Sequence, residues 1–237
     1  MGTVVLVTGG ARSGKSLFAE TLAAGLGACV TYVATAEVSD AEMEARVARH
    51  RERRPASWIT REAPHDLRSG LAGLDQQVDV VLVDCLTVWA SNRLLALGDP
   101  EQGGWWAAVE ALDRTLADEV GAVLALARDA PWHLVLVTNE VGYGVVPPTT
   151  LGRTFRDLLG RLNQWVAAQA DAVFLVVAGL GVEVKRLAVA PRAWAHSVMA
   201  AEEHPDLGRE RQGTHDASRR RDESHRTARQ GGHGGSA

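Results

Sequence analysis

The sequence predicts an α/β fold, with a mostly parallel β-sheet and helices on both of its faces. The first observation is that apolar, β-branched runs recur along the chain with helical patterns between them. Strands that alternate with helices form βαβ units, whose strands are parallel. The second observation is that these runs are apolar along their whole length, as in strands covered on both faces. The third is a glycine-rich run, residues 9–16, between the first strand and the first helix.

Each element follows from its local pattern, in chain order. The apolar run at 3–8 is the first expected strand, and the helix at 15–26 follows the glycines. A capping-box pattern at 39–42 starts the next helix, and Pro55 ends it near Arg53. The other expected strands are 29–34, 78–84, 134–138 and 172–177, with a further extended segment near 182–190. The expected helices are 15–26, 40–53, 86–97, 105–128 and 151–169.

The glycine-rich run is the most informative motif of the chain. It has the pattern G-x-x-x-x-G-K-S in the strand–loop–helix context that a P-loop requires. Its glycines let backbone N–H groups curl around phosphate oxygens, and the N-terminus of the following helix adds partial positive charge. We expect Lys15 to contact the β- and γ-phosphates and Ser16 to hold Mg2+. The expected phosphate-binding residues are Gly9, Gly10, Ala11, Arg12, Ser13, Gly14, Lys15 and Ser16.

Length and composition predict one P-loop domain, residues 1–200, followed by a tail. From 204 to 237 the chain is rich in Arg, His, Gly, Ser, Asp and Glu and nearly free of large apolar residues. We expect this tail to be disordered, because it cannot bury enough apolar surface to offset the entropy of ordering. The formal net charge of −4 argues against a general nucleic-acid binder. No apolar window reaches the length of a membrane span.

Cysteine usage and the N-terminal sequence predict a cytoplasmic protein. Cys29 and Cys85 lie in apolar contexts and outside any CxxC or Cys/His metal pattern, so we expect both to be buried and reduced. The first strand begins at once, which leaves no room for a signal peptide.

A second phosphate-site residue is predicted where the apolar run at 80–83 ends in Asp84. In P-loop proteins an aspartate at this place lies across from the phosphates and helps to hold Mg2+. Many strands end in an aspartate, so the motif is weak alone. Together with the P-loop it favours a Walker B role for Asp84.

The basic segment at 46–54 has two competing interpretations. Helical spacing places Arg46 and Arg53 on the same face as His50. Spacing alone favours a solvated basic helix face with an incidental histidine. The chemical alternative is that neighbouring positive charges keep the imidazole neutral and therefore nucleophilic, while the arginines bind phosphate oxygens.

The polar run at 138–147 follows an expected strand, so it should emerge at the carboxyl edge of the sheet, where open α/β sheets bind ligands. Asn139 and Glu140 could bind substrate hydroxyls, amides or a metal. The competing interpretation is a polar turn with a helix cap. Arg153, Arg156 and Asp157 follow on an amphipathic helix, where they are equally consistent with ordinary surface charges.

Taken together, these segments resemble one family. The resembling blocks are the P-loop at 9–16; Arg46-Val-x-x-His50 with Arg54-Pro55 and Trp58; Val83-Asp84-Cys85-Leu86-Thr87-x-Trp89 with Asn92; Asn139-Glu140-Val141-Gly142-x-Gly144-x-Val146-Pro147; Arg153-x-Phe155-Arg156-Asp157; Gly160 with Asn163-Gln164; and Ala178-Gly179 before Lys185. From residue 4 to about 187 the chain resembles the bifunctional adenosylcobinamide kinase/adenosylcobinamide-phosphate guanylyltransferase of cobalamin biosynthesis.

The resemblance implies a RecA-like P-loop fold, a homotrimer and two reactions. The family phosphorylates the aminopropanol hydroxyl of adenosylcobinamide with ATP or GTP. It then transfers GMP from GTP to adenosylcobinamide phosphate through a GMP-histidine and releases pyrophosphate. Carried over by motif, His50 is the guanylylated residue, and the segment 9–16 holds phosphates. The other implied nucleotide contacts are Ala34, Thr35, Ala36, Arg51, Glu52, Arg53, Arg54, Glu62 and Asp84.

The chain departs from the family pattern in three places. Arg49 adds a cation directly before His50, and Gly181 stands where a proline is expected. The arginine-rich tail has no counterpart that we can name. Neither of the first two departures is expected to abolish activity.

Two other interpretations stay open. An enzyme that retains only the kinase or only the guanylyltransferase would use the same P-loop and Asp84, so the sequence does not separate it. A non-enzymatic nucleotide switch or assembly ATPase is the second, although we identify no arginine-finger or effector-loop pattern. For the corrinoid, Trp89, Trp105 and Trp106 are candidates to line a surface, with core packing the favoured role of each one.

Overall fold

The structure, a computed structural model, describes residues 1–37, 48, 51–52, 54–74, 77–195 and 199. By its contacts the chain divides into two compact units, Met1–Leu187 and Ala188–Ala237. The first unit contains the sheet. In the second unit, the backbone N–H of Trp194 donates to the carbonyl of Ala190 in a short helical segment. The predicted tail at 204–237 lies outside the described residues, so the predicted division at 200–204 stays a prediction.

Among the described residues, seven strands form one sheet in the order β3-β2-β4-β5-β1-β6-β7. All neighbouring strands are parallel except β6 and β7, which are antiparallel. Strand β5 therefore lies between the P-loop strand β1 and the strand β4 that ends in Asp84, and the mostly parallel sheet confirms the predicted α/β class. The strands are β1 Val4–Thr8, β2 Val30–Ala34, β3 Ile59–Glu62, β4 Val80–Asp84, β5 His133–Val137, β6 Ala172–Val177 and β7 Leu180–Glu183.

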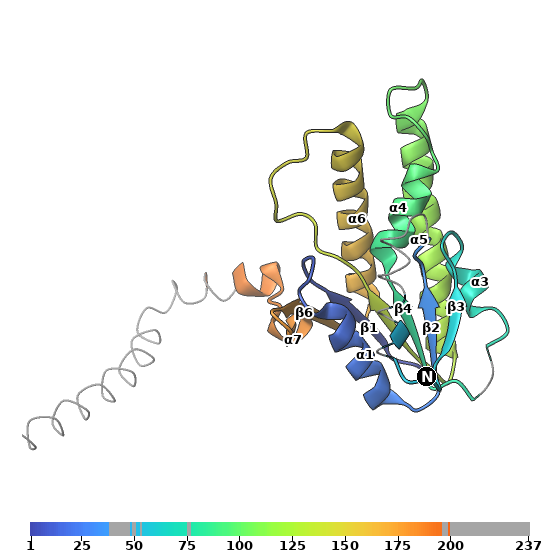
Figure 1. Ribbon diagram of the computed structural model, residues 1–237. Helices are drawn as coiled ribbons and strands as arrows, with labels where there is room; N and C mark the ends of the chain where they lie inside the picture. The colour runs from blue at the N-terminus through green and yellow to red at the C-terminus, as the bar shows by residue number, and fades with distance from the viewer. Residues whose placement is uncertain (38–47, 49–50, 53, 75–76, 196–198, 200–237) are drawn as a thin grey trace, which may run out of the picture. The chain divides into compact units, whose positions relative to one another are not determined.

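Helices cover both faces of this sheet. Helix α1 packs against one face, where alternate strand residues such as Val5 and Val7 are buried with Ala19 and Ala23 of the helix. The other alternation of the same strands is buried beneath α3, α4, α5 and α6. Helices α5 and α6 are the longest and stand side by side (Figure 1). The helices are α1 Lys15–Leu26, α3 Leu67–Leu71, α4 Leu86–Leu95, α5 Trp105–Asp129, α6 Thr150–Gln169 and α7 Val184–Leu187.

The local predictions hold best for long or motif-bearing elements. The predicted helix 15–26 matches α1 at both ends, and the predicted strand 172–177 matches β6. The predicted helix 40–53 lies mostly outside the described residues, although residues 48, 51 and 52 are helical. The short elements β3 and α3 were not predicted.

The extended segment predicted near 182–190 is wrong beyond its first two residues. Strand β7 ends at Glu183, and α7 begins at the next residue. The reason is that the Glu183 carboxylate accepts the backbone N–H groups of Lys185 and Arg186, which satisfies the free donors of a helix start.

The structure also bears on the expectations for the cysteines and for Gly181. Cys29 is exposed, because the strand begins one residue later, so the prediction that both cysteines are buried is wrong for it. Cys85 is half-buried, so the prediction holds only in part for Cys85. The glycine at 181, where we expected a proline, has a packing reason. A Cβ atom on Gly181 would lie only 2.4 Å from the ring of Phe18, which occupies that space.

The tryptophans divide between core and surface. Trp89 is fully buried and Trp105 is 4% exposed, and both belong to the core beneath α4 and α5. The favoured packing role is therefore confirmed for these two. Trp106 is 63% exposed, so of the three it is the one whose side chain faces outward.

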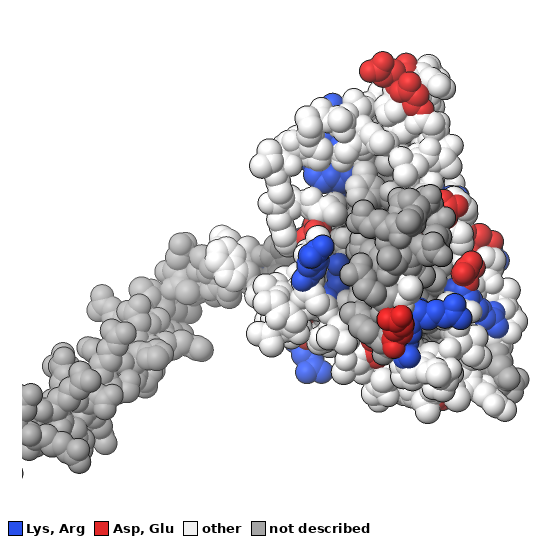
Figure 2. Space-filling view, viewed as in Figure 1, with Lys and Arg blue, Asp and Glu red and all other residues white. Residues whose placement is uncertain are grey.

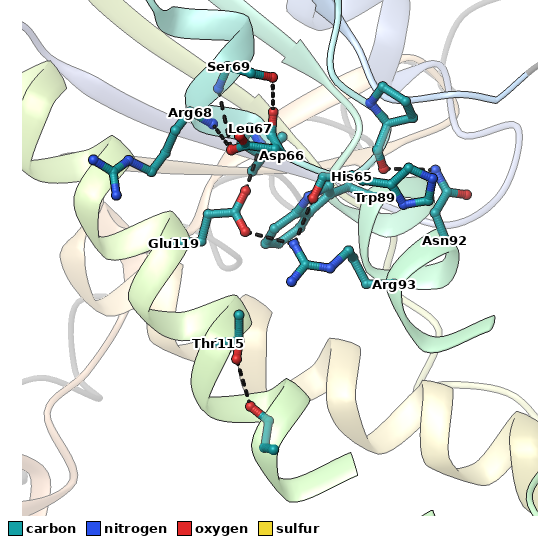
Figure 3. A network of polar contacts seen from close by, with 12 residues as sticks. His65, Asp66, Leu67, Arg68, Ser69, Trp89, Asn92, Arg93, Thr115 and Glu119 are labelled. Atoms are coloured by element: carbon teal, nitrogen blue, oxygen red, sulfur yellow. Dashed lines mark hydrogen bonds and ion pairs between the residues drawn. The ribbon is translucent and has the colours of Figure 1, made fainter. Parts of the chain in front are cut away.

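A polar network ties the segment after β3 to α4 and α5 (Figure 3). The carboxylate of Glu119 accepts the backbone N–H of Leu67 at 2.7 Å and the guanidinium of Arg93 at 2.8 Å. Arg93 also donates to the carbonyl of His65 at 2.6 Å, which the Trp89 indole shares at 3.2 Å. This network fixes the segment that follows β3 against α4 and α5, and it does not include any residue of the P-loop.

Charge is mixed on the one face of the described residues that Figure 2 shows. On the face shown in Figure 2, lysine and arginine side chains alternate with aspartate and glutamate instead of gathering into one patch. None of the helices in the described ranges is both long and apolar enough to span a membrane.

Candidate active site at the carboxyl edge of the sheet

Strand register brings three predicted site residues into one row. Ala34 at the end of β2 pairs with Glu62 of β3 on one side and with Asp84 of β4 on the other. The row continues through Val137 of β5 to Val7 of β1. All these positions lie at the carboxyl ends of parallel strands, which is where ligands bind in open α/β sheets. The sheet thus places Asp84 two strands away from the P-loop strand.

The P-loop folds into the compact cradle that its sequence predicts. The backbone N–H of Ser13 donates to the carbonyl of Gly10 at 3.3 Å, and the Lys15 amino group donates to the same carbonyl at 3.3 Å. Gly14, in the left-handed region at φ 93°, precedes α1. The loop ends at the N-terminus of a twelve-residue helix, so its backbone donors and the helix dipole favour a bound anion.

The turn between β6 and β7 supports this cradle from behind. The backbone N–H of Gly179 donates to the carbonyl of Ser13 at 2.7 Å. Gly179 also lies against Gly14, where a Cβ atom would be 2.9 Å from the Gly179 Cα. The P-loop conformation therefore depends on a contact with a segment more than 160 residues further along the chain.

We expect Gly14→Ala to disrupt the P-loop. The new methyl group would meet a backbone atom, and alanine is strained at φ 93°. Left-handed backbone strain at a non-glycine residue costs about 1–3 kcal/mol of unfolding free energy. Chemical denaturation should show this loss, and calorimetric titration should show nucleotide affinity reduced about 100-fold or more, since a shift of the loop misaligns several phosphate donors at once.

Gly10→Ala is the matched stability control for this change. A Cβ atom on Gly10 would have no described atom within 4 Å, and its φ lies outside the left-handed region. Its unfolding free energy should stay close to that of the parent protein. Equal stability losses in the two variants would contradict the steric argument at Gly14.

Asp84 is held by a buried tyrosine. The Tyr32 hydroxyl donates to Asp84 Oδ2 at 3.2 Å. Burial raises the pKa of Tyr32 far above its usual value, and the Asp84 carboxylate raises it further, so the hydroxyl stays protonated as a donor. The guanidinium carbon of Arg54 lies 3.6 Å from the centroid of the same ring, a cation–π contact. Tyr32 thus links the carboxylate to the segment that follows His50 in sequence.

We expect Tyr32→Phe to weaken the site without unfolding the protein. It removes one hydrogen bond to a carboxylate, worth about 1.5–3 kcal/mol at most, and keeps the ring under Arg54. Partners of metal-binding carboxylates typically contribute about 10–100-fold to metal affinity or activity. The Mg2+ concentration that gives half of the maximal initial rate of phosphate transfer from the nucleotide should therefore rise about tenfold. Tyr143→Phe is the control, because Tyr143 is 83% exposed. An unchanged Mg2+ dependence in Tyr32→Phe would show that the hydroxyl does not position Asp84.

Thr35 clamps the ends of β2 and β4 together. Its hydroxyl donates to the carbonyl of Cys85 and accepts the Cys85 backbone N–H, both at 2.8 Å. The Asn92 side chain donates to the Thr35 carbonyl at 2.9 Å. Ala36 follows Thr35 in the chain and is half-buried.

Burial raises the pKa of the Cys85 thiol to about 11, and the neighbouring Asp84 carboxylate adds to the shift, so this thiol is neutral at physiological pH.

A second network holds the polar loop after β5. The backbone N–H of Asn139 donates to the Thr87 hydroxyl at 2.6 Å, and its carbonyl accepts the Asn163 amide at 2.9 Å. Thr138 completes the network by donating to Asn163 at 2.7 Å. The backbone N–H of Glu140 then donates to the carbonyl of Gly9 at 3.1 Å. The loop is therefore joined directly to the P-loop.

The residues at this edge fit a magnesium ion of the P-loop type. Ser16 lies in the first turn of α1, which packs against β1, β4 and β5, and Asp84 ends β4. Within the described part of the chain, no three His, Cys, Asp or Glu side chains gather into a metal cluster. Mg2+ needs none, because it is commonly held by one or two protein oxygens together with water and substrate phosphates.

The structure brings together most of the predicted site residues and leaves some outside its description. The P-loop, Ala34, Thr35, Ala36, Glu62 and Asp84 share the carboxyl edge, and Arg54 reaches it through Tyr32. Arg51 and Glu52 are helical and exposed. His50 and Arg53 lie outside the described residues, so their roles stay predictions.

Sequence reasoning missed the supporting residue Tyr32. It quoted Thr87 and Asn163 only as parts of motifs and Thr138 only as the start of a polar run, and it gave none of the three a supporting role. Tyr32 stands beside Thr31 in a short, otherwise apolar strand, and a tyrosine in such a place is usually a packing residue. The Tyr32 hydroxyl donates its hydrogen bond to Asp84, 52 residues further along the chain, so no local sequence pattern identifies this contact.

Residues 5–184 match the family described as "Cobinamide kinase / cobinamide phosphate guanyltransferase". Over 185 residues the chain is 46% identical to the "Bifunctional adenosylcobalamin biosynthesis protein CobU" of Salmonella typhimurium, covering 77% of this chain and 99% of that protein. Over 180 residues it is 42% identical to the "Bifunctional adenosylcobalamin biosynthesis protein CobP" of Pseudomonas aeruginosa, covering 76% and 96%. Among solved structures, the RadB recombinase is similar at a TM-score of 0.42 and 16% identity, with 73% of each chain covered.

Proposed function

The chain belongs to the cobinamide kinase/cobinamide phosphate guanyltransferase family, and from this premise we propose how its residues carry the two reactions. It is a bifunctional transferase of adenosylcobalamin synthesis, which phosphorylates adenosylcobinamide and then transfers GMP to adenosylcobinamide phosphate. The observation that carries this conclusion is the identity of 46% to a bifunctional relative over 99% of that protein's length. The region that matches the family, residues 5–184, includes the P-loop, Asp84 and the loop after β5.

We propose ATP or GTP as the phosphate donor and GTP as the GMP donor. The cradle at 9–16 would bind the triphosphate, with Lys15 on its β- and γ-oxygens. Its backbone donors and the dipole of α1 support this role. In the proposed complex Mg2+ would be held by Ser16 and Asp84, where it would neutralise charge on the phosphates. The other proposed nucleotide contacts are Ala34, Thr35, Ala36, Arg51, Glu52, Arg53, Arg54 and Glu62.

We propose His50 as the nucleophile of the guanylyl transfer. Its neutral imidazole would attack the α-phosphorus of GTP; a nitrogen–phosphorus bond forms, the bond from the α-phosphorus to the bridging oxygen breaks, and pyrophosphate leaves. The cobinamide phosphate oxygen would then attack the same phosphorus and release the imidazole. Arginines of the same segment would bind the phosphate oxygens, and Arg54 is already placed against the ring that holds Asp84.

We also propose that the protein works in the cytoplasm as a homotrimer, with residues 1–200 as the catalytic part. The triphosphates that it uses are cytoplasmic metabolites. The family resemblance supports the trimer, and sedimentation of the purified chain would test it. A monomer at micromolar concentration with full activity would contradict it.

The test of the function follows each label from GTP to product. Purified protein is incubated with cobinamide, Mg2+ and GTP labelled at either the γ- or the α-phosphate. We expect γ-label in cobinamide phosphate first, and α-label in GDP-cobinamide afterwards, with release of pyrophosphate. Only γ-label in product would indicate a kinase alone. Only α-label, obtained with supplied cobinamide phosphate, would indicate a guanylyltransferase alone. Nucleotide binding without any product would favour a switch.

A further inference from the structure

A pocket of about 600 Å³ opens beside the P-loop, on the face of the sheet that α6 covers. Leu6 of β1 and Val173 of β6 form its apolar floor, and Thr8 lies next to them at the end of β1. The next residue along the chain is the first glycine of the P-loop. The pocket therefore begins where the phosphate cradle begins.

The walls of the pocket are polar. Glu140 comes from the loop after β5, and Arg156, Asp157 and Gln164 come from α6. Arg156 donates to the Asp157 carboxylate at 2.8 Å, and Arg161 also lines the pocket, so two arginines balance the charge of Asp157 and Glu140. The buried hydroxyl of Thr8 has no hydrogen-bond partner among the described residues. A buried hydroxyl without a partner is costly, and a bound ligand would satisfy it.

The loop that carries Glu140 connects the pocket to the reacting phosphates. The Glu140 backbone N–H donates to the carbonyl of Gly9, and its carboxylate accepts the backbone N–H of Gly142 at 3.0 Å. The carboxylate is thus oriented by its own loop while it lines the pocket. A ligand in the pocket would contact a phosphate in the cradle on one side and a carboxylate on the other.

We propose that this pocket binds the hydroxyl-bearing amide arm of the acceptor, cobinamide, and that Glu140 accepts the hydroxyl proton in the kinase step. This inference rests on the proposed function. Hydrogen-bonding walls of balanced charge suit a neutral amide arm, and the volume suits such an arm better than a whole corrin macrocycle. The macrocycle would remain outside the mouth of the pocket.

The arm's hydroxyl oxygen attacks the γ-phosphorus, and a new oxygen–phosphorus bond forms. The bond between that phosphorus and the β,γ-bridging oxygen breaks, and the nucleoside diphosphate leaves with the electron pair. The hydroxyl proton passes to the Glu140 carboxylate. Arg156 then faces the new phosphate, whose charge it can bind in place of Asp157.

The test separates acceptor binding from nucleotide chemistry, because covalent GMP labelling of the protein from GTP needs no acceptor. Glu140→Gln should lower the kcat of cobinamide phosphorylation by about 100-fold or more, the usual range for loss of a general base. Arg156→Gln should raise the KM for cobinamide phosphate in GMP transfer about tenfold or more. Both variants should still take up α-label from GTP as the parent protein does. Arg114→Gln, an exposed arginine of α5 outside the pocket lining, is the matched control.

Each outcome decides between the two proposals. If parent protein forms product and both pocket variants keep parent kcat and KM for the acceptors, the pocket is not the acceptor site. If both variants lose α-labelling together with acceptor use, they act on nucleotide binding, and the assignment is also overturned. If the parent protein itself forms no product, the proposed function fails before the pocket is tested.

Discussion

Replacing His50 by alanine is expected to abolish covalent attachment of GMP to the protein. An imidazole nitrogen is the proposed nucleophile, and alanine offers none, so label from α-labelled GTP should fall at least about 1,000-fold. Phosphorylation of cobinamide from γ-labelled ATP should remain, because that step transfers the phosphate directly to the acceptor. The measurement is radiolabel on denatured protein, and the bond in the parent protein should be acid-labile and alkali-stable, as a phosphoramidate is.

The control for this result is His65→Ala. His65 is another histidine of the chain. It follows β3, and its ring nitrogen Nε2 lies 2.6 Å from the Glu37 carboxylate. Its loss should leave the label in place. Full labelling of His50→Ala would exclude His50 as the nucleophile, and labelling that requires His65 would move the role there.

Replacing Lys15 by alanine is expected to stop phosphate transfer to cobinamide. The structure places the lysine amino group on the P-loop, bonded to the carbonyl of Gly10, at the N-terminus of α1. In phosphoryl transfer the protein contributes mainly positioning and charge stabilisation, and removing one such group costs about 100–1,000-fold in kcat. Initial rates with γ-labelled ATP or GTP and saturating cobinamide measure the loss.

Lys15→Arg distinguishes charge from geometry in this experiment. Arginine keeps the positive charge but presents a planar fork in place of a compact ammonium. We expect partial recovery of nucleotide binding and little recovery of kcat. A Lys15→Ala rate within tenfold of the parent rate would mean that the lysine does not contact the transferred phosphate.

His50→Ala and Lys15→Ala also test whether the two reactions share one nucleotide site. Tyr32 contacts Asp84 through its hydroxyl and Arg54 through its ring face, so the proposed magnesium ligand Asp84 and the basic segment meet at one buried side chain. If the sites are shared, Lys15→Ala should reduce GMP labelling as well as kinase activity. Independent sites would leave the labelling of Lys15→Ala unchanged.

Much of the fold and of the site followed from local sequence patterns. The P-loop and α1 were predicted to the residue, because a contiguous motif with correct flanks defines both the turn and the helix start. The long helices α5 and α6 were predicted within one residue at each end, because a periodic apolar face persists over many turns. Asp84 was found because it ends an apolar run.

The elements that were missed are those that tertiary contacts stabilise. Residues 59–62 mix polar and apolar side chains and are mostly exposed, so no alternation identifies β3; pairing with β2 makes it a strand. Strand β7, of which only the last two residues fell in the predicted extended segment, exists through its antiparallel pairing with β6, and its turn requires a left-handed Gly179. Short segments such as these have little intrinsic preference, and the sheet decides their conformation.

The sequence by itself determined the class of fold, the phosphate cradle, the acid at the end of β4 and the family. Only the tertiary structure decided which polar groups meet: Tyr32 with Asp84, Glu140 with Gly9, and Asn163 with the loop after β5. The physical reason is that a motif acts over a few adjacent residues, whereas these contacts join positions 24 to 131 residues apart in the chain. Strand order and register, together with the packing of α6 on the sheet, bring such positions within hydrogen-bonding distance.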